Sequence, residues 1–91
     1  MEDKIRRHIL FFGRVQGVGF RYYSVHKASS LGLTGWVRNL YDGSVEMEVQ
    51  GAESVIDNLL QFLESQRHIV IERMESKDIP LQEDRGFHEV G

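Results

Sequence analysis

A glycine-rich segment, GRVQGVGFR at residues 13–21, lies between an apolar stretch and a segment with helical spacing. The first N–H groups of a helix have no internal partners, and the helix dipole adds partial positive charge there. Glycines let the preceding peptides turn their N–H groups toward a common hollow. The segment therefore predicts a site for a phosphate or a similar anion, although a purely structural glycine-rich turn would show the same pattern.

Arg21 lies in the first turn of the expected helix, where a cation is electrostatically unfavourable. This position is explained if its guanidinium reaches back to a bound anion with two parallel hydrogen bonds. A solvated helix arginine is the alternative. Two commoner phosphate motifs are excluded, because a nucleoside-triphosphate loop ends in Gly-Lys-Ser/Thr and a dinucleotide loop needs a third glycine where this chain has Tyr22.

Hydrophobic spacing predicts the elements that position this loop. The expected strands are residues 5–12, 33–40, 44–50 and 68–74, with a possible short edge strand at 86–90. The expected helices are residues 20–31 and a second helix that begins at Ser54. Two helices with one apolar face each must cover one face of a single sheet. We therefore predict an α+β fold, a ferredoxin-like β-α-β-β-α-β sandwich with an antiparallel four- to five-stranded sheet and two helices on one face.

Local signals support these boundaries. Gly32 is a natural end for the first helix, and Asp42-Gly43 is typical of a hairpin turn between the second and third strands. Ser54 and Asp57 resemble a capping box at the start of the second helix. The apolar stripe expected to be buried on that helix consists of Ile56, Leu59, Leu60 and Leu63.

Length and charge limit the function classes. The 91 residues suffice for one domain, residues 1–91, and the chain has no cysteine. Residues 1–40 carry seven basic and two acidic residues, and residues 41–91 carry four basic and twelve acidic ones. The net charges are therefore +5 and −8, which favours a small anion near the glycine loop over a long polyanion. No secretory signal or membrane span is seen, so we expect a cytoplasmic protein.

The motifs resemble the signatures of the acylphosphatase family. GRVQGVGFR at residues 13–21 is followed by GLTGWVRN at 32–39 and DGSVE at 42–46, in the order and spacing of that family. The resemblance extends over about residues 5–65, and the family has the β-α-β-β-α-β fold predicted above. It departs at residues 86–91, where family members often carry an arginine or tyrosine that is absent here.

The resemblance implies hydrolysis of the carboxyl–phosphate anhydride of acyl phosphates, without a metal or other cofactor. Arg21 is implied to bind the phosphate and neutralise charge as the bond breaks, while the side-chain amide of Asn39 holds the attacking water. From the residues alone, Asn39 could instead begin an Asx turn before Asp42. The main-chain N–H groups implied to hold the phosphate are those of Val15, Gln16, Gly17, Val18, Gly19 and Phe20.

Two other functions share this fold. One is a catalytically silent anion-binding module, against which the intact Arg21 and Asn39 argue. The other is an RNA-recognition domain, which needs exposed aromatic residues on its central strands, whereas residues 44–50 place glutamates on the solvated face. The four histidines show no metal-ligand spacing.

Together, the sequence features and the resemblance lead us to expect a monomer with a small acyl phosphate as substrate. Inorganic phosphate is expected as product and competitive inhibitor, and no nucleic-acid or membrane partner is expected.

Overall fold

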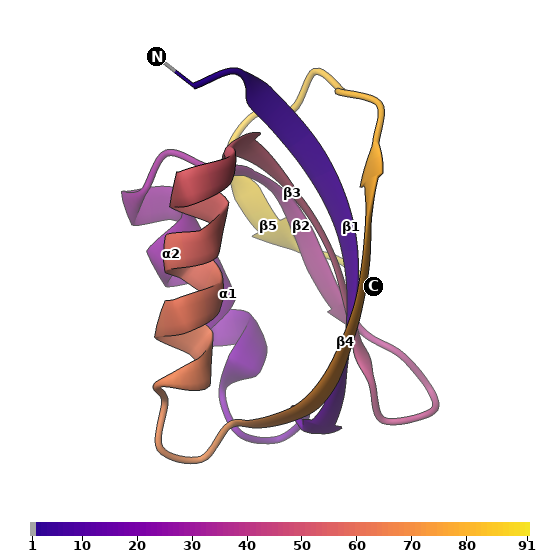
Figure 1. Cartoon of the computed structure of the whole chain (residues 1–91). Coiled ribbons are helices and arrows are strands. Elements are labelled where there is room, and N and C mark those ends of the chain that lie inside the picture. The colour runs from indigo at the N-terminus through magenta and orange to yellow at the C-terminus, as the bar shows by residue number, and fades with distance from the viewer. Residues whose placement is uncertain (1) are drawn as a thin grey trace.

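The computed structural model describes residues 2–91 as a sheet with two helices packed on one side of it (Figure 1). The elements are β1 (Lys4–Arg14), α1 (Phe20–Ser30), β2 (Thr34–Asn39), β3 (Val45–Ala52), α2 (Glu53–Glu64), β4 (Val70–Ile79) and β5 (Phe87–Glu89). The predicted β-α-β-β-α-β order and the ferredoxin-like sandwich are confirmed. Within residues 2–91, neither helix is long and apolar enough to cross a membrane.

The sheet has the strand order β4-β1-β3-β2-β5, so β1 and β3 lie at its centre. The pairs β4–β1, β1–β3 and β3–β2 are antiparallel, but β5 pairs in parallel with β2. The prediction of a wholly antiparallel sheet is therefore wrong in this detail. The reason is topological, because β4 and β2 run in opposite directions and a chain that leaves the end of β4 reaches the far edge where β2 begins.

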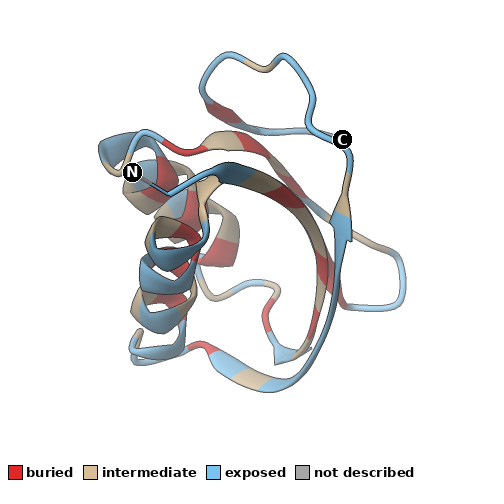
Figure 2. Ribbon diagram, turned by 45° about the horizontal axis from the view of Figure 1, so that its top comes forward, coloured by how far each residue is buried: buried red, intermediate tan, exposed pale blue. Residues whose placement is uncertain are grey.

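The core lies between the helices and the sheet (Figure 2). Strand β3 alternates as predicted, with Val45, Met47 and Val49 completely buried and the residues between them on the opposite face. Of the expected stripe on α2, three residues are completely buried and Leu60 is only half-buried. Burying such side chains contributes about 1.5–3 kcal/mol each, which is the main favourable contribution to the folding of so small a domain.

The capping box predicted for the second helix is wrong. Helix α2 begins one residue earlier, at Glu53, and its N-cap is Ala52, which makes no capping hydrogen bond through a side chain. The main-chain N–H and the hydroxyl of Ser54 both donate to the carboxylate of Glu2 instead. The hydrogen bonds from Ser54 hold the pKa of Glu2 below its usual value. A residue that precedes the first strand therefore accepts a hydrogen bond from one of the free N–H groups at this helix start.

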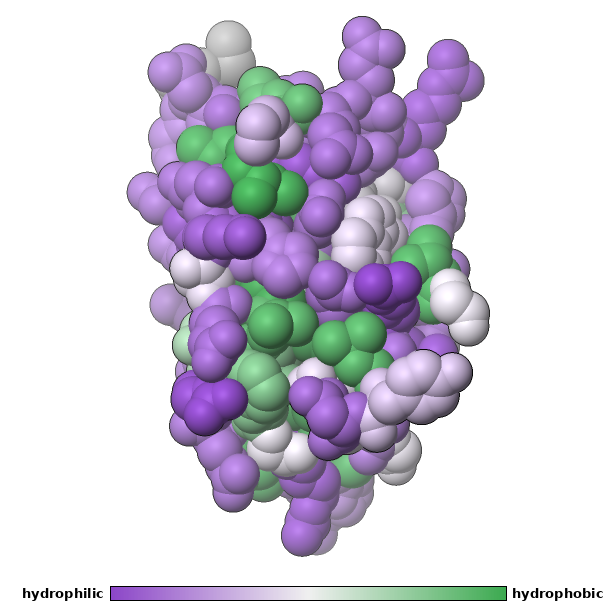
Figure 3. Space-filling view, turned by 90° about the vertical axis from the view of Figure 1, so that its right-hand side faces the viewer, coloured by the Kyte–Doolittle hydropathy of each residue, from purple (hydrophilic) through white to green (hydrophobic). Residues whose placement is uncertain are grey.

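The face of the sheet that carries no helix is predominantly hydrophilic, with small apolar patches (Figure 3). Near the start of the central strand β1, the buried guanidinium of Arg6 contacts Glu48 at 2.9 Å and Asp84 at 2.6 Å. Asp84 belongs to the connection between β4 and β5. Because charged hydrogen bonds to a buried arginine fix both partners, this contact holds the connection across the sheet and so positions β5.

The outward glutamates of β3 are paired and are not free in solvent. Glu46 contacts Nε2 of His8 at 2.8 Å and Nε of Arg38 at 2.6 Å. Burial raises the pKa of Glu46, but the hydrogen bonds from His8 and Arg38 lower it more, so the net pKa lies below its usual value. This carboxylate therefore stays ionised at neutral pH on the face where an RNA-recognition domain would bind its ligand.

Candidate active site

The glycine-rich loop joins β1 to α1 and is anchored at both ends by buried side chains. Val15 and Phe20 are almost completely buried. The ring of Phe20 packs against Phe11 with a centroid distance of 4.8 Å. Between these anchors Gly17 and Gly19 are exposed. The main chain of the loop therefore faces solvent while its ends are fixed in the core.

The loop presents unpaired main-chain donors. Gly17 and Gly19 have φ angles of +74° and +84°, which only glycine adopts without strain. Gly19 is the N-cap of α1, no side chain caps this helix, and its first turn contains no acidic residue. Among residues 2–91, the N–H groups of residues 16–19 form no hydrogen bond to another protein group. These donors, together with the positive end of the helix dipole, form an arrangement that suits an anion.

A hollow of about 160 Å³ lies against this loop. It is smaller than the roughly 300–1,000 Å³ of drug-sized ligand pockets, so it suits a group such as phosphate rather than a large substrate. Of the residues expected to form the site, Gln16 and Val18 do not line the hollow. Those that line it are Val15, Gly17, Gly19, Phe20, Arg21 and Asn39, joined by Tyr22 and Glu89.

Asn39 is the last residue of β2, on the same side of the strand as the buried Val37 and Gly35. Its Oδ1 atom is buried and, among the residues that the structure describes, has no hydrogen-bond partner. A buried acceptor of this kind usually marks a bound water or a functional role. The alternative that Asn39 begins an Asx turn has no support among the hydrogen bonds, because the adjacent hairpin uses Asp42 for this purpose.

In that hairpin, the Oδ1 atom of Asp42 accepts hydrogen bonds from the main-chain N–H of Ser44 at 2.9 Å and from its hydroxyl at 2.5 Å. These hydrogen bonds lower the pKa of Asp42 below its usual value. The predicted Asp42-Gly43 turn is present, and the N–H of Leu40 donates to the carbonyl of Ser44 at 2.9 Å to close it. The strand end that carries Asn39 is therefore fixed by its own hairpin.

Sequence reasoning did not find Glu89, which lines the hollow from β5. Its Oε1 atom lies 3.4 Å from Nε of Arg21, and both side chains are about half-exposed. An exposed pair of this kind contributes little to stability. The pair instead affects which atoms of Arg21 can bind a ligand. Because the carboxylate lies at Nε, the two terminal nitrogens of the guanidinium remain available. Nothing in the sequence indicated this role for a glutamate in the polar C-terminal segment.

The side chain of Gln16 was also not predicted to contribute. Its Nε2 atom donates to the carbonyls of Leu40 and Ser44, each at 2.8 Å. Leu40 directly follows Asn39. One carboxamide therefore connects the glycine loop to the hairpin that carries Asn39, so the two sides of the hollow are held in register.

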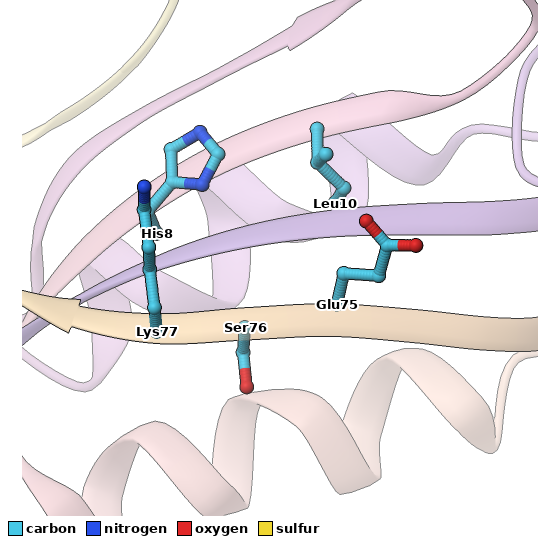
Figure 4. A pocket seen from close by; sticks show the side chains of 5 residues that line it. All are labelled: His8, Leu10, Glu75, Ser76 and Lys77. Carbon is cyan, nitrogen blue, oxygen red and sulfur yellow. The ribbon is translucent and has the colours of Figure 1, made fainter.

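Two further hollows border the sheet. One of about 590 Å³ lies between the hairpin and the last residue, lined by Arg38, Asn39, Leu40, Tyr41 and Gly91. The other, of about 200 Å³, lies on the sheet face away from the helices. There His8, Leu10, Glu75 and Lys77 project to one side of β1 and β4, while Ser76 points to the other (Figure 4). Neither contains a helix N-terminus or a row of free N–H groups, so the hollow at the glycine loop remains the best anion site.

Comparison with known proteins supports the resemblance seen in the sequence. A family model described as acylphosphatase matches residues 7–89. An acylphosphatase of Trichormus variabilis is 55% identical over 58 residues, which cover 64% of this chain and 57% of that protein. The chain thus spans less than two thirds of the length of the curated relatives that it matches, with shares from 57% to 64%.

Solved structures agree with this over almost the whole chain. An acylphosphatase from Coxiella burnetii superposes with a TM-score of 0.87 at 30% identity, covering 97% of this chain and 94% of that one. An acylphosphatase from Bacillus subtilis gives a TM-score of 0.88 at 29% identity, covering 96% and 99%. Because the family model covers nearly all of the described residues and the fold is shared, this chain belongs to the acylphosphatase family.

Proposed function

We propose that this protein hydrolyses the carboxyl–phosphate anhydride of acyl phosphates to a carboxylate and inorganic phosphate. The observation that carries the proposal is the grouping, around one small hollow, of unpaired loop N–H groups, the guanidinium of Arg21 and the unpartnered Oδ1 of Asn39. The first two suit a phosphoryl group, and the third suits a water molecule. Family membership supports the same activity.

In the proposed reaction, the oxygen of a water attacks phosphorus in line with the bond to the carboxylate oxygen. The new P–O bond forms as the anhydride bond breaks. The electron pair of the broken bond stays on the departing carboxylate. No covalent enzyme intermediate is formed. Because carboxylate is a good leaving group, positioning and charge stabilisation suffice in the loose transition state of phosphoryl transfer.

Each group has a separate task in this proposal. The N–H groups of residues 15–20 and Arg21 bind the phosphoryl oxygens and stabilise their charge. Asn39 is too weakly basic to remove a proton, so it orients the water by hydrogen bonding. One proton of the water stays on the attacking oxygen and the other passes to a phosphate oxygen, giving dihydrogen phosphate, which then exchanges protons with the solvent. Neither a metal nor a cofactor takes part. The monomeric state, cytoplasmic location and lack of nucleic-acid or membrane partners stay predictions.

The test is hydrolysis of benzoyl phosphate by the purified protein in the presence of EDTA, with release of benzoate and phosphate measured. We expect turnover that EDTA does not change and that inorganic phosphate inhibits competitively. Loss of activity on chelation would indicate a metal mechanism, and non-competitive behaviour of phosphate would remove the proposed anion site. Binding of phosphate without any turnover would favour the catalytically silent module on the same fold.

Gln16 is expected to act as a positioning residue in this reaction. In Gln16→Leu, the two carbonyls at the hairpin lose their common donor, so the loop and Asn39 are no longer held in register. We expect kcat for benzoyl phosphate to fall about tenfold, because a small misplacement of reacting groups is costly. KM and the inhibition constant of phosphate should change by less than about threefold, since the loop N–H groups themselves remain.

The matched control is Gln66→Leu. Gln66 also donates through Nε2 to a main-chain carbonyl, that of Phe62 at 3.0 Å, but it lies just beyond the end of α2 and does not line the hollow at the glycine loop. Both variants should lose about 1 kcal/mol of unfolding free energy, measured by urea denaturation. Only Gln16→Leu should show a lower kcat for benzoyl phosphate than the wild type. Equal kcat values in the two variants would show that the link between loop and hairpin serves stability alone.

A further inference from the structure

Tyr22 is an aromatic residue at the mouth of the hollow whose role the proposed reaction does not explain. It follows Arg21 in the first turn of α1 and lines the same hollow. The residue is 60% exposed, so it contributes little to the core. An exposed aromatic beside a small anion site is a candidate for contact with the part of the substrate that extends out of that site.

The ring of Tyr22 is held by its neighbours and does not project freely. The ring of His26, one turn later on α1, lies 4.4 Å away between centroids. The ring of Tyr23 packs edge-on at 5.7 Å, and Tyr23 in turn contacts Phe62 of α2 at 6.1 Å. This support reduces the conformational entropy that a ligand would have to overcome in order to use the ring as a surface.

The geometry of in-line attack excludes the larger hollow as the place for the acyl group. The attacking water and the departing carboxylate lie on opposite sides of phosphorus. Asn39 is the residue shared by the phosphate-sized hollow and the 590 Å³ hollow, so it stands between them. If Asn39 holds the water, the larger hollow is on the side of the nucleophile. The acyl group must then leave on the side away from the larger hollow. Tyr22 lines the phosphate-sized hollow and not the larger one, which makes it the candidate for contact with that group.

The charges around the hollow also limit the charge that the acyl group can carry. Glu89 lines it, and its carboxylate faces Arg21 at 3.4 Å. Arg21 is the one cationic side chain among the described residues that line this hollow, and the phosphate would occupy it. A second carboxylate on the acyl group would therefore meet Glu89 without a cation to compensate for the repulsion.

We infer that Tyr22 determines substrate specificity by packing against the acyl group, and that the protein prefers acyl phosphates with an aromatic or apolar acyl group and no second negative charge. This inference rests on the proposed function. Aromatic rings prefer offset or edge-on contacts with other rings, and Tyr22 is exposed enough to make such a contact. A small acyl group such as acetyl is too short to cover the ring.

The experiment compares kcat/KM for benzoyl, acetyl and succinyl phosphate in the wild type, Tyr22→Ala, Tyr22→Phe and Tyr41→Ala. The wild type should favour benzoyl phosphate and hydrolyse succinyl phosphate least. In Tyr22→Ala, we expect kcat/KM for benzoyl phosphate to fall about fivefold, with acetyl phosphate unchanged within about twofold. Tyr22→Phe should behave as the wild type, because the ring and not the hydroxyl makes the contact.

Tyr41→Ala is the matched control, since Tyr41 is a fully exposed tyrosine that lines the larger hollow. It should leave both substrates within about twofold of the wild type. A selective loss for benzoyl phosphate in Tyr41→Ala, or an equal loss for benzoyl and acetyl phosphate in Tyr22→Ala, would overturn the inference while leaving the hydrolase proposal intact. If the wild type hydrolyses none of the three substrates, the proposed function itself fails. Thermal unfolding of each variant confirms that the fold is retained.

Discussion

Replacing Arg21 with alanine is expected to lower kcat/KM for benzoyl phosphate by at least a few hundredfold. This corresponds to a loss of about 3–4 kcal/mol of transition-state stabilisation, the magnitude found when one preorganised donor to a developing negative charge is removed. Arg21 lies beside unpaired loop N–H groups, and the carboxylate of Glu89 lies 3.4 Å from its Nε atom. Its terminal nitrogens are therefore free to meet two phosphoryl oxygens, and no other cationic side chain among the described lining residues could replace it.

The inhibition constant of inorganic phosphate is the second measurement. Because Arg21 is proposed to bind phosphate in the ground state as well, Arg21→Ala should raise this constant at least tenfold, so that both KM and kcat are affected. Arg21→Lys should recover little, since a point charge cannot make the two parallel hydrogen bonds of a guanidinium. These effects distinguish an arginine that binds the phosphate directly from one that only adds positive charge near the site.

Arg14→Ala is the control for that distinction. Arg14 ends β1, is exposed and lies just before the loop, so its removal changes the local charge by the same amount. It should alter kcat/KM by less than about threefold, and less still at higher ionic strength, where exposed charges are screened. If Arg14→Ala and Arg21→Ala reduced activity equally, the role assigned to Arg21 would be wrong.

The parts of this fold that the sequence predicted are those set by local periodicity. The alternation of residues 45–49 placed Val45 and Met47 on the buried face, and the structure confirms this. The Asp42-Gly43 pair predicted a turn, and Gly43 has the expected positive φ of +92°. In both cases the information lies within a few neighbouring residues, where steric and burial preferences are strongest.

The features that the sequence did not predict depend on contacts between distant segments. The start of α2 was misplaced because Glu2, more than fifty residues away, provides the acceptor for Ser54. The parallel edge strand β5 depends on a connection that Asp84 attaches to Arg6 of β1. No local pattern around residues 86–90 encodes that contact, so neither the direction of β5 nor the approach of Glu89 to Arg21 could be predicted.

The candidate site combines both kinds of information. Glycine spacing and the strand-to-helix junction predicted an anion site on physical grounds, and the resemblance added Asn39. The loop and Asn39 are separated by about twenty residues, and only the fold shows that they line one hollow. The side chain of Gln16 was not predicted to contribute, although a carboxamide between valine and glycine is a polar group that needs hydrogen-bond partners.

Replacing Asn39 with alanine is expected to reduce kcat by a few hundredfold, again about 3–4 kcal/mol by analogy with single oriented donors. In contrast to Arg21→Ala, KM and the inhibition constant of phosphate should change by less than about threefold. The reason is that Asn39 is proposed to hold the water and not the phosphate. Such a separation of kcat from KM is the signature of an interaction that acts only in the transition state.

The stability of this variant provides an independent check. The Oδ1 atom of Asn39 is buried without a protein partner, and a buried unsatisfied acceptor destabilises the folded state by about 1–3 kcal/mol unless water satisfies it. Asn39→Ala removes this atom, so the free energy of unfolding in urea should be unchanged or higher than in the wild type. Asn58→Ala, an exposed change on α2, should leave both activity and stability unaltered.

A fall in unfolding free energy of more than about 1 kcal/mol in Asn39→Ala would show that the amide is a structural group with partners of its own, and its loss of kcat would then need no oriented water. A stable variant that binds phosphate normally but turns over substrate slowly would mean that the protein maintains an unsatisfied amide because the reaction requires it. Proteins commonly keep such locally unfavourable groups at functional sites. The unpaired oxygen of Asn39 would then be a stability cost that the arrangement of β2 and its hairpin maintains for catalysis.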